Sequence, residues 1–122
     1  MSTSSFRDLR VWQKAMKLTA DIDRRTEDFP RHELYGLSQQ VRRAAVSVAS
    51  NIAEGKGHRS DREFVHFLYH ARGSLLEVQT QLLIAEELQY LSNDEAQRLL
   101  ATADGVGRAL SGLINSMRPQ AA

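Results

Sequence analysis

The chain has 122 residues, of which 42% are hydrophobic and 25% charged, with a formal net charge of +1. This length predicts a single domain over residues 1–122, large enough to bury a core without covalent cross-links. The absence of cysteine excludes disulfide scaffolds, thiol nucleophiles and zinc–thiolate sites. Because no apolar run is long enough for a membrane span or a secretory signal, we expect a cytoplasmic protein with no membrane partner.

The small net charge conceals a basic middle segment. Residues 42–72 carry a net charge of +3, whereas residues 73–122 carry −3. Arginine binds phosphates well, since its planar group makes two parallel hydrogen bonds. We therefore predict a nucleic-acid-binding surface in this segment; the alternative is an ordinary solvated surface. The candidate residues are Arg42, Arg43, Lys56, Arg59, Arg62 and Arg72.

Helical periodicity dominates the chain, and the first helix is predicted over residues 7–28. Ser4 or Ser5 can cap its start. Phe29-Pro30 ends it, because the residue before proline avoids the helical region. The face expected to be buried consists of Leu9, Trp12, Met16, Thr19 and Ile22.

The second helix is predicted over residues 37–54, with Gly55 as a left-handed C-terminal cap. Its polar stripe is narrow, so we expect neighbours to cover it on more than one side. We interpret Asn51 as a buried amide that joins helices. The main apolar face consists of Leu37, Val41, Ala44, Ala45, Val48 and Ile52, with Ala49 and Ala53 on an adjoining face.

The third helix is predicted over residues 60–91, after a capping box formed by Ser60 and Glu63. Its main apolar stripe runs from Phe64 to Ala85. A second stripe predicts a further neighbour, such as another subunit, and consists of Phe67, Leu76, Leu83 and Tyr90.

The fourth helix is predicted over residues 93–117, after a second capping box, Ser92 to Glu95. Its apolar residues follow a 3–4 spacing from Ala96 to Met117. Four amphipathic helices with short connections predict an all-α fold, an antiparallel up-down-up-down four-helix bundle. The surplus apolar stripes predict that the bundle forms a homo-oligomer.

One pattern resembles a metal site. Glu63 and His66 form a Glu-x-x-His motif, and His70 follows at i+4 on the same face. Di-iron bundles need two such motifs and two further carboxylates, so we interpret this stripe as polar surface or subunit contact and expect no metal. No G-x-S-x-G or P-loop motif is present. We therefore expect no enzymatic activity and no cofactor.

Three segments resemble the signature of the 23S rRNA intervening-sequence protein family. These are ELYGL at 33–37, QVRRAAVSV at 40–48 and SNIAEG at 50–55, with further matches over about residues 6–117. The resemblance implies a four-helix bundle that assembles as a ring-shaped homopentamer. The similar accessory variability proteins of retroelements bind nucleic acid and a reverse transcriptase through a basic barrel. Arg42, Arg43 and Arg72 fall on positions of the family motif.

Three hypotheses of function follow. The first is a non-enzymatic oligomeric bundle that binds RNA, DNA or a nucleoprotein partner through its basic surface. The second is a structural or protein-interaction ring, in which the basic segment pairs with the acidic C-terminal third across subunits. The third is a metal-binding bundle that uses Glu63, His66 and His70.

Overall fold

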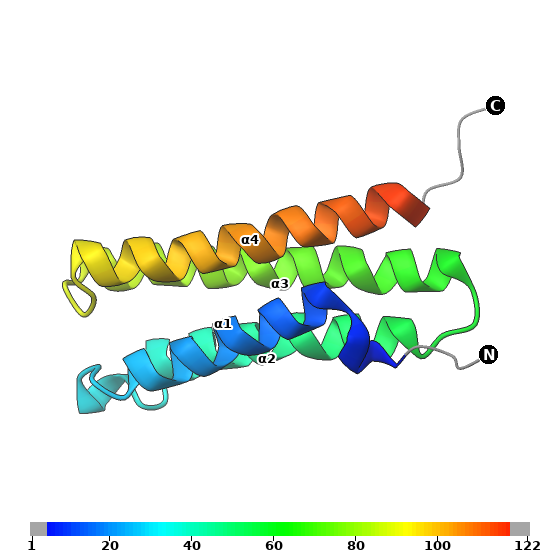
Figure 1. Cartoon of the computed structure of the whole chain (residues 1–122). Coiled ribbons are helices and arrows are strands. Elements are labelled where there is room, and N and C mark those ends of the chain that lie inside the picture. The colour runs from blue at the N-terminus through cyan, green and yellow to red at the C-terminus, as the bar shows by residue number, and fades with distance from the viewer. Residues whose placement is uncertain (1–4, 118–122) are drawn as a thin grey trace.

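The computed structural model describes residues 5–117, which fold into four long helices (Figure 1). This confirms the predicted all-α class. The elements are η1 (Phe6–Asp8), α1 (Arg10–Thr26), η2 (Arg31–Glu33), α2 (Leu37–Lys56), α3 (Asp61–Glu87) and α4 (Asn93–Met117), where η denotes a 3₁₀ helix. The α1 helix lies against α2 and α4, and α3 also lies against α2 and α4, so that α1 and α3 are diagonal to each other. Figure 1 shows consecutive helices running in opposite directions.

One continuous core lies between the four helices. The predicted main faces of the second and third helices are all buried. Each large aliphatic side chain that is removed from water contributes roughly 1.5–3 kcal/mol of transfer free energy. The largest side chains with almost no exposed surface include Leu18, Ile22, Ile52, Leu68, Leu82, Leu110 and Ile114.

The first helix begins later than predicted and buries a different face. Ser5 and Asp8 form a capping box around the short η1 helix, and the extended backbone at Leu9 separates η1 from α1. The buried face of α1 consists of Val11, Ala15, Leu18, Ile22 and Thr26. The expectation that Met16 is buried was therefore wrong, because its side chain is 44% exposed.

Gly55 does not have the role predicted from its position. The α2 helix continues through Gly55 to Lys56, and no glycine in residues 5–117 has a positive φ angle. A Cβ atom at Gly55 would lie 2.7 Å from Cβ of Phe67 and 3.0 Å from the ring of Phe64. Glycine is required here because the start of α3 approaches the α2 backbone closely.

The α3 helix ends at Glu87, four residues earlier than predicted, because the chain turns at Gln89. Gln89 has a φ angle of 63°. Its N–H donates to the carbonyl oxygen of Glu86 at 2.9 Å, and the N–H of Tyr90 donates to the carbonyl oxygen of Ala85 at 2.9 Å. This pair of bonds is a Schellman motif, which usually has glycine at the left-handed position.

Replacing Gln89 with glycine is therefore expected to raise the free energy of unfolding by about 1 kcal/mol. A left-handed backbone costs a non-glycine residue roughly 1–2 kcal/mol, and the greater unfolded-state entropy of glycine offsets part of the gain. Urea denaturation measures this change. The control is Gln97→Gly within α4, which should cost about 1 kcal/mol. A Gln89→Gly protein less stable than the wild type would contradict this explanation.

A carboxylate joins the two loops at one end of the bundle. Oε1 of Glu33 accepts the N–H of Leu37 at 3.0 Å, and Oε2 accepts the hydroxyl of Tyr90 at 2.9 Å. These bonds, of which the backbone bond has the larger effect, hold the pKa of Glu33 below its usual value. The bond from its hydroxyl to Glu33 is also the main cause of the raised pKa of Tyr90.

The lowered pKa of Glu33 predicts a loss of stability in acid. A carboxyl whose pKa is lower in the folded state stabilises the fold above its unfolded pKa, and this contribution is lost as the pH falls through the folded pKa. Below about pH 4.5, the unfolding free energy of Glu33→Gln should fall less steeply than that of the wild type. Urea denaturation at a series of pH values measures both slopes. Glu27→Gln, at an exposed position, should follow the wild type; equal slopes for Glu33→Gln and the wild type would contradict this prediction.

Candidate nucleic-acid interface

The structure distributes the six predicted cations over several places. The three residues Lys56, Arg59 and Arg62 lie at or beside the α2–α3 connection, at one end of the bundle. Arg59 and Arg62 are exposed, whereas Lys56 is half-buried, with its ammonium 5.9 Å from the ring centre of Phe64. These three residues form one local basic group.

The other three predicted arginines lie along the sides of the bundle. Arg42 connects two helices, because its Nε donates to Oγ1 of Thr26 at 2.6 Å and lies 3.5 Å from a carboxylate oxygen of Asp23. Arg43 lies at the groove between α2 and α3. Arg72 lies at the groove between α3 and α4, with its guanidinium 4.8 Å from the ring centre of Tyr69. The six residues therefore do not form one continuous surface.

Asn51 connects helices only indirectly. Its side-chain amide donates to the carbonyl and Oγ of Ser47 within α2, at 2.8 and 3.1 Å. The hydroxyl of Ser47 in turn bonds that of Ser74 at 2.9 Å, which joins α2 to α3. Asn51 is half-buried rather than buried, so its role is to orient the serine that makes the contact between the helices.

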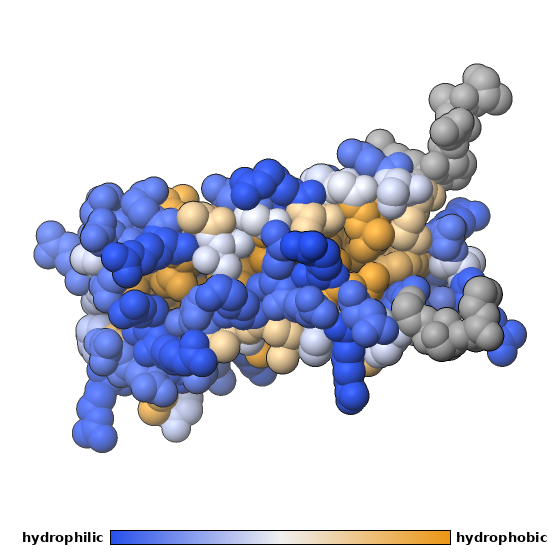
Figure 2. Space-filling model, viewed as in Figure 1, coloured by the Kyte–Doolittle hydropathy of each residue, from blue (hydrophilic) through white to orange (hydrophobic). Residues whose placement is uncertain are grey.

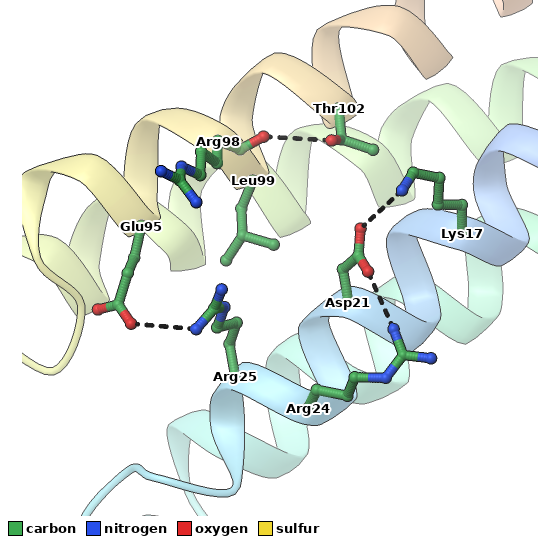
Figure 3. A pocket seen from close by; sticks show the side chains of 8 residues that line it. All are labelled: Lys17, Asp21, Arg24, Arg25, Glu95, Arg98, Leu99 and Thr102. Atoms are coloured by element: carbon green, nitrogen blue, oxygen red, sulfur yellow. Dashed lines mark hydrogen bonds and ion pairs between the residues drawn. The ribbon is translucent and has the colours of Figure 1, made fainter.

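A basic groove that the sequence analysis did not identify lies between α1 and α4 (Figure 3). The guanidinium groups of Arg25 and Arg98 reach into this hollow from the two helices, on either side of Leu99. We call this hollow the α1–α4 groove. Four of its lining side chains are cationic and two are acidic. The lining residues are Lys17, Asp21, Arg24, Arg25, Glu95, Arg98, Leu99 and Thr102.

The two carboxylates in the groove hold three of its cations in place. Asp21 pairs with Lys17 at 3.7 Å and with Arg24 at 3.1 Å. Glu95 pairs with Arg25 at 3.4 Å through Oε2, while its Oε1 accepts the N–H of Ser92 at 2.9 Å. The bond from Ser92 is the largest cause of the lowered pKa of Glu95.

The predicted capping box at Ser92 is confirmed, because Glu95 accepts the N–H of Ser92 and the hydroxyl oxygen of Ser92 accepts the N–H of Glu95. The same carboxylate also pairs with Arg25. With four cations and two carboxylates, the α1–α4 groove keeps a surplus of positive charge.

The positive charge continues along α1 beyond the groove. A second hollow, lined by Arg10, Gln13, Lys14 and Lys17, shares Lys17 with the α1–α4 groove. Residues spaced three or four apart lie on one face of a helix. This face appears in Figure 2, where hydrophilic side chains cover much of the surface over α1 and α4. Guanidinium and ammonium groups arranged in this way bind anions, and phosphates above all.

The spacing of basic residues along α1 is a sequence signal for this groove, and a sum of charges does not detect it. Residues 1–41 carry seven basic and six acidic groups, and their nearly balanced sum concealed the spatial arrangement. The helical spacing of Arg10, Lys14, Lys17 and Arg24 indicates a shared face. The contribution of Arg98 could not be predicted from spacing within one helix, because it depends on how α4 packs beside α1.

The structure also bears on other classes of site. Among residues 5–117, no three histidine, aspartate or glutamate side chains are placed to hold a metal ion together. No helix in this part of the chain is long and apolar enough to cross a membrane. The α1–α4 groove is our candidate binding site because cationic side chains from two helices line it.

Comparison with known proteins agrees with the fold. A crystal structure of a protein of unknown function from the S23 ribosomal protein family of Bacteroides thetaiotaomicron is similar, with a TM-score of 0.77 and 18% identity. The match covers 85% of this chain and 97% of that one. No curated protein matches the chain. The profile of the 23S rRNA-intervening sequence proteins matches residues 7–112, and the chain belongs to the 23S rRNA-intervening sequence protein family.

Proposed function

We propose that the protein is a non-enzymatic, oligomeric helical bundle that binds RNA or a nucleoprotein partner, with the α1–α4 groove as the principal contact. The observation that carries this proposal is the convergence of Lys17, Arg24, Arg25 and Arg98 from two helices on one hollow. Sequence-independent binding to nucleic acid depends mainly on such contacts with phosphates. The family name, which refers to an rRNA insert, makes RNA the first ligand to test.

The ion pairs in the groove suit this role. Asp21 pairs with Lys17 and Arg24, and Glu95 pairs with Arg25. Exposed pairs of this kind contribute only about 0–1 kcal/mol each, so a phosphate can replace a carboxylate as the partner at little cost. The basic group at Lys56, Arg59 and Arg62 is a second proposed contact, at the end of the bundle.

Fluorescence anisotropy with a labelled RNA hairpin tests binding. If four phosphates are contacted, affinity should fall on the order of a hundredfold between about 50 and 200 mM salt. A DNA duplex of matching sequence shows whether RNA is preferred. Absence of binding to either probe at low salt would refute the nucleic-acid role. An oligomer that binds neither probe would instead support the protein-interaction ring.

The assembly is proposed from an apolar strip on the outer surface of α3. Leu76 and Leu83 are 59% and 52% exposed. Together with half-buried Val65 and Tyr69, they repeat at heptad-like intervals on the side of α3 that leads to the α3–α4 groove. Such a strip is typical of a helix with a further helical neighbour. A second copy of the chain supplies that neighbour, and the family resemblance favours a pentamer.

Replacing Leu76 and Leu83 together with glutamate is expected to dissociate the oligomer. The two carboxylates would have to be buried without partners in the interface, which costs several kcal/mol. Sedimentation velocity measures the change in mass. The control is Met16→Glu, at an exposed apolar position on α1, diagonally across the bundle from α3; it should leave the assembly intact. A monomeric wild-type protein, or an unchanged mass for the double variant, would contradict this interface.

A further inference from the structure

Three of the four histidines lie at the start of α3 or in the connection before it. Nδ1 of His58 bonds the carboxylate of Glu63, and the His58 ring stacks on Phe67 with the ring centres 4.7 Å apart. Glu63 therefore faces His58. As a result, Ser60 and Glu63 form only half of the predicted capping box, in which Oγ of Ser60 accepts the N–H of Glu63 at 3.1 Å.

The three-residue metal set suggested by the sequence is accordingly not assembled. Glu63 is engaged by His58, and His66 and His70 are left as a pair. Their two Nε2 atoms lie 3.2 Å apart, and their rings meet edge to face at 86°. Both side chains are exposed. The structure thus contains a smaller and different arrangement from the predicted one.

The separation of the two nitrogens matches that of ligands on one metal ion. Zinc–imidazole bonds are about 2.0–2.1 Å long, so two nitrogens at a tetrahedral angle lie about 3.3–3.4 Å apart. Because the residues are four apart on one helix, the backbone holds both rings over the same surface. The two Nε2 atoms lie within hydrogen-bond distance of each other, so at least one ring must turn before both lone pairs face an ion. Both side chains are exposed, which leaves room for that turn.

We propose that His66 and His70 chelate one divalent transition-metal ion through their Nε2 atoms, with water in the remaining positions. Imidazole ligands suit Zn²⁺, Ni²⁺ and Cu²⁺, whereas Mg²⁺ is bound by oxygen ligands. Protonated imidazole is not a ligand, so binding weakens in acid. This site lies on α3, diagonally across the bundle from α1, so it is separate from the α1–α4 groove. Arg62 of the second proposed contact, in contrast, lines the same hollow as His66.

Isothermal titration calorimetry with NiCl₂ and ZnCl₂, on protein without a histidine tag, tests this site. We expect one ion per chain, at least a tenfold loss of affinity in His66→Ala and in His70→Ala, and no heat of binding with MgCl₂. The matched control is His32→Ala, at the opposite end of the bundle beside Tyr90, which should bind as the wild type does.

Two further readouts complete the test. Affinity measured near pH 5 should be lower than near pH 7.5, because protons compete for the imidazoles. Circular dichroism shows whether each variant retains its helices, which we expect because both histidines are exposed. Wild-type affinity in His66→Ala or His70→Ala, or a wild-type protein that binds neither metal ion, would overturn the proposal.

Discussion

Replacing Gly55 with alanine is expected to lower the free energy of unfolding by about 1–2 kcal/mol. The added methyl would lie 2.7 Å from Cβ of Phe67, an atom close to the backbone that cannot move independently of α3. Overpacking of this kind costs about 1–3 kcal/mol, and the better helix propensity of alanine recovers up to about 1 kcal/mol. Since the contact is severe, the net effect is destabilising.

The same substitution at Gly112 should have the opposite sign. No atom would lie within 4 Å of a Cβ at Gly112, which is exposed on α4. Gly112→Ala should therefore gain up to about 1 kcal/mol from helix propensity alone. Urea denaturation of both variants measures the difference. A Gly55→Ala protein as stable as the wild type would show that α2 and α3 do not approach each other as closely as described.

Changing Lys17, Arg24, Arg25 and Arg98 together to glutamine should weaken RNA binding on the order of a hundredfold near 100 mM salt. Each lost phosphate contact should also reduce the slope of log affinity against log salt by about 0.9. The fold should persist, because these side chains form only exposed ion pairs. Fluorescence anisotropy measures both affinity and slope.

Two comparisons make this result specific. A variant with Lys56, Arg59 and Arg62 changed to glutamine should lose less affinity, since these cations form the second contact. Asp21→Asn should bind RNA on the order of fivefold more tightly, because Lys17 and Arg24 lose a competing carboxylate. If the Lys56 group causes the larger loss, the principal contact lies at the end of the bundle and not in the groove.

The fold was largely predictable because its signals are local. Apolar spacing located the buried faces of α2 and α3, and Ser92 with Glu95 marked the start of α4. The predictions were wrong where a helix end lacked its usual residue, or where a glycine was present for a reason other than ending a helix. Gln89 ends α3 in a conformation usually taken by glycine, and Gly55 is required by a contact with a residue twelve positions later.

The candidate site was harder to predict because charge sums along the chain ignore spatial neighbours. Arg42 belongs to the predicted basic segment, but its guanidinium is engaged by Thr26 and Asp23. Arg25 and Arg98 are far apart in sequence, and only the packing of α4 beside α1 brings them to one hollow. The spacing of residues within one helix does not predict which other helix it packs against.

Ultraviolet cross-linking of the wild-type protein to the RNA hairpin, followed by mass spectrometry of the linked peptides, tests the central claim most directly. Contact through the α1–α4 groove predicts cross-links in residues 10–25 of α1 and residues 95–102 of α4. Cross-links confined to the α2–α3 connection and the outer surface of α3 would contradict it.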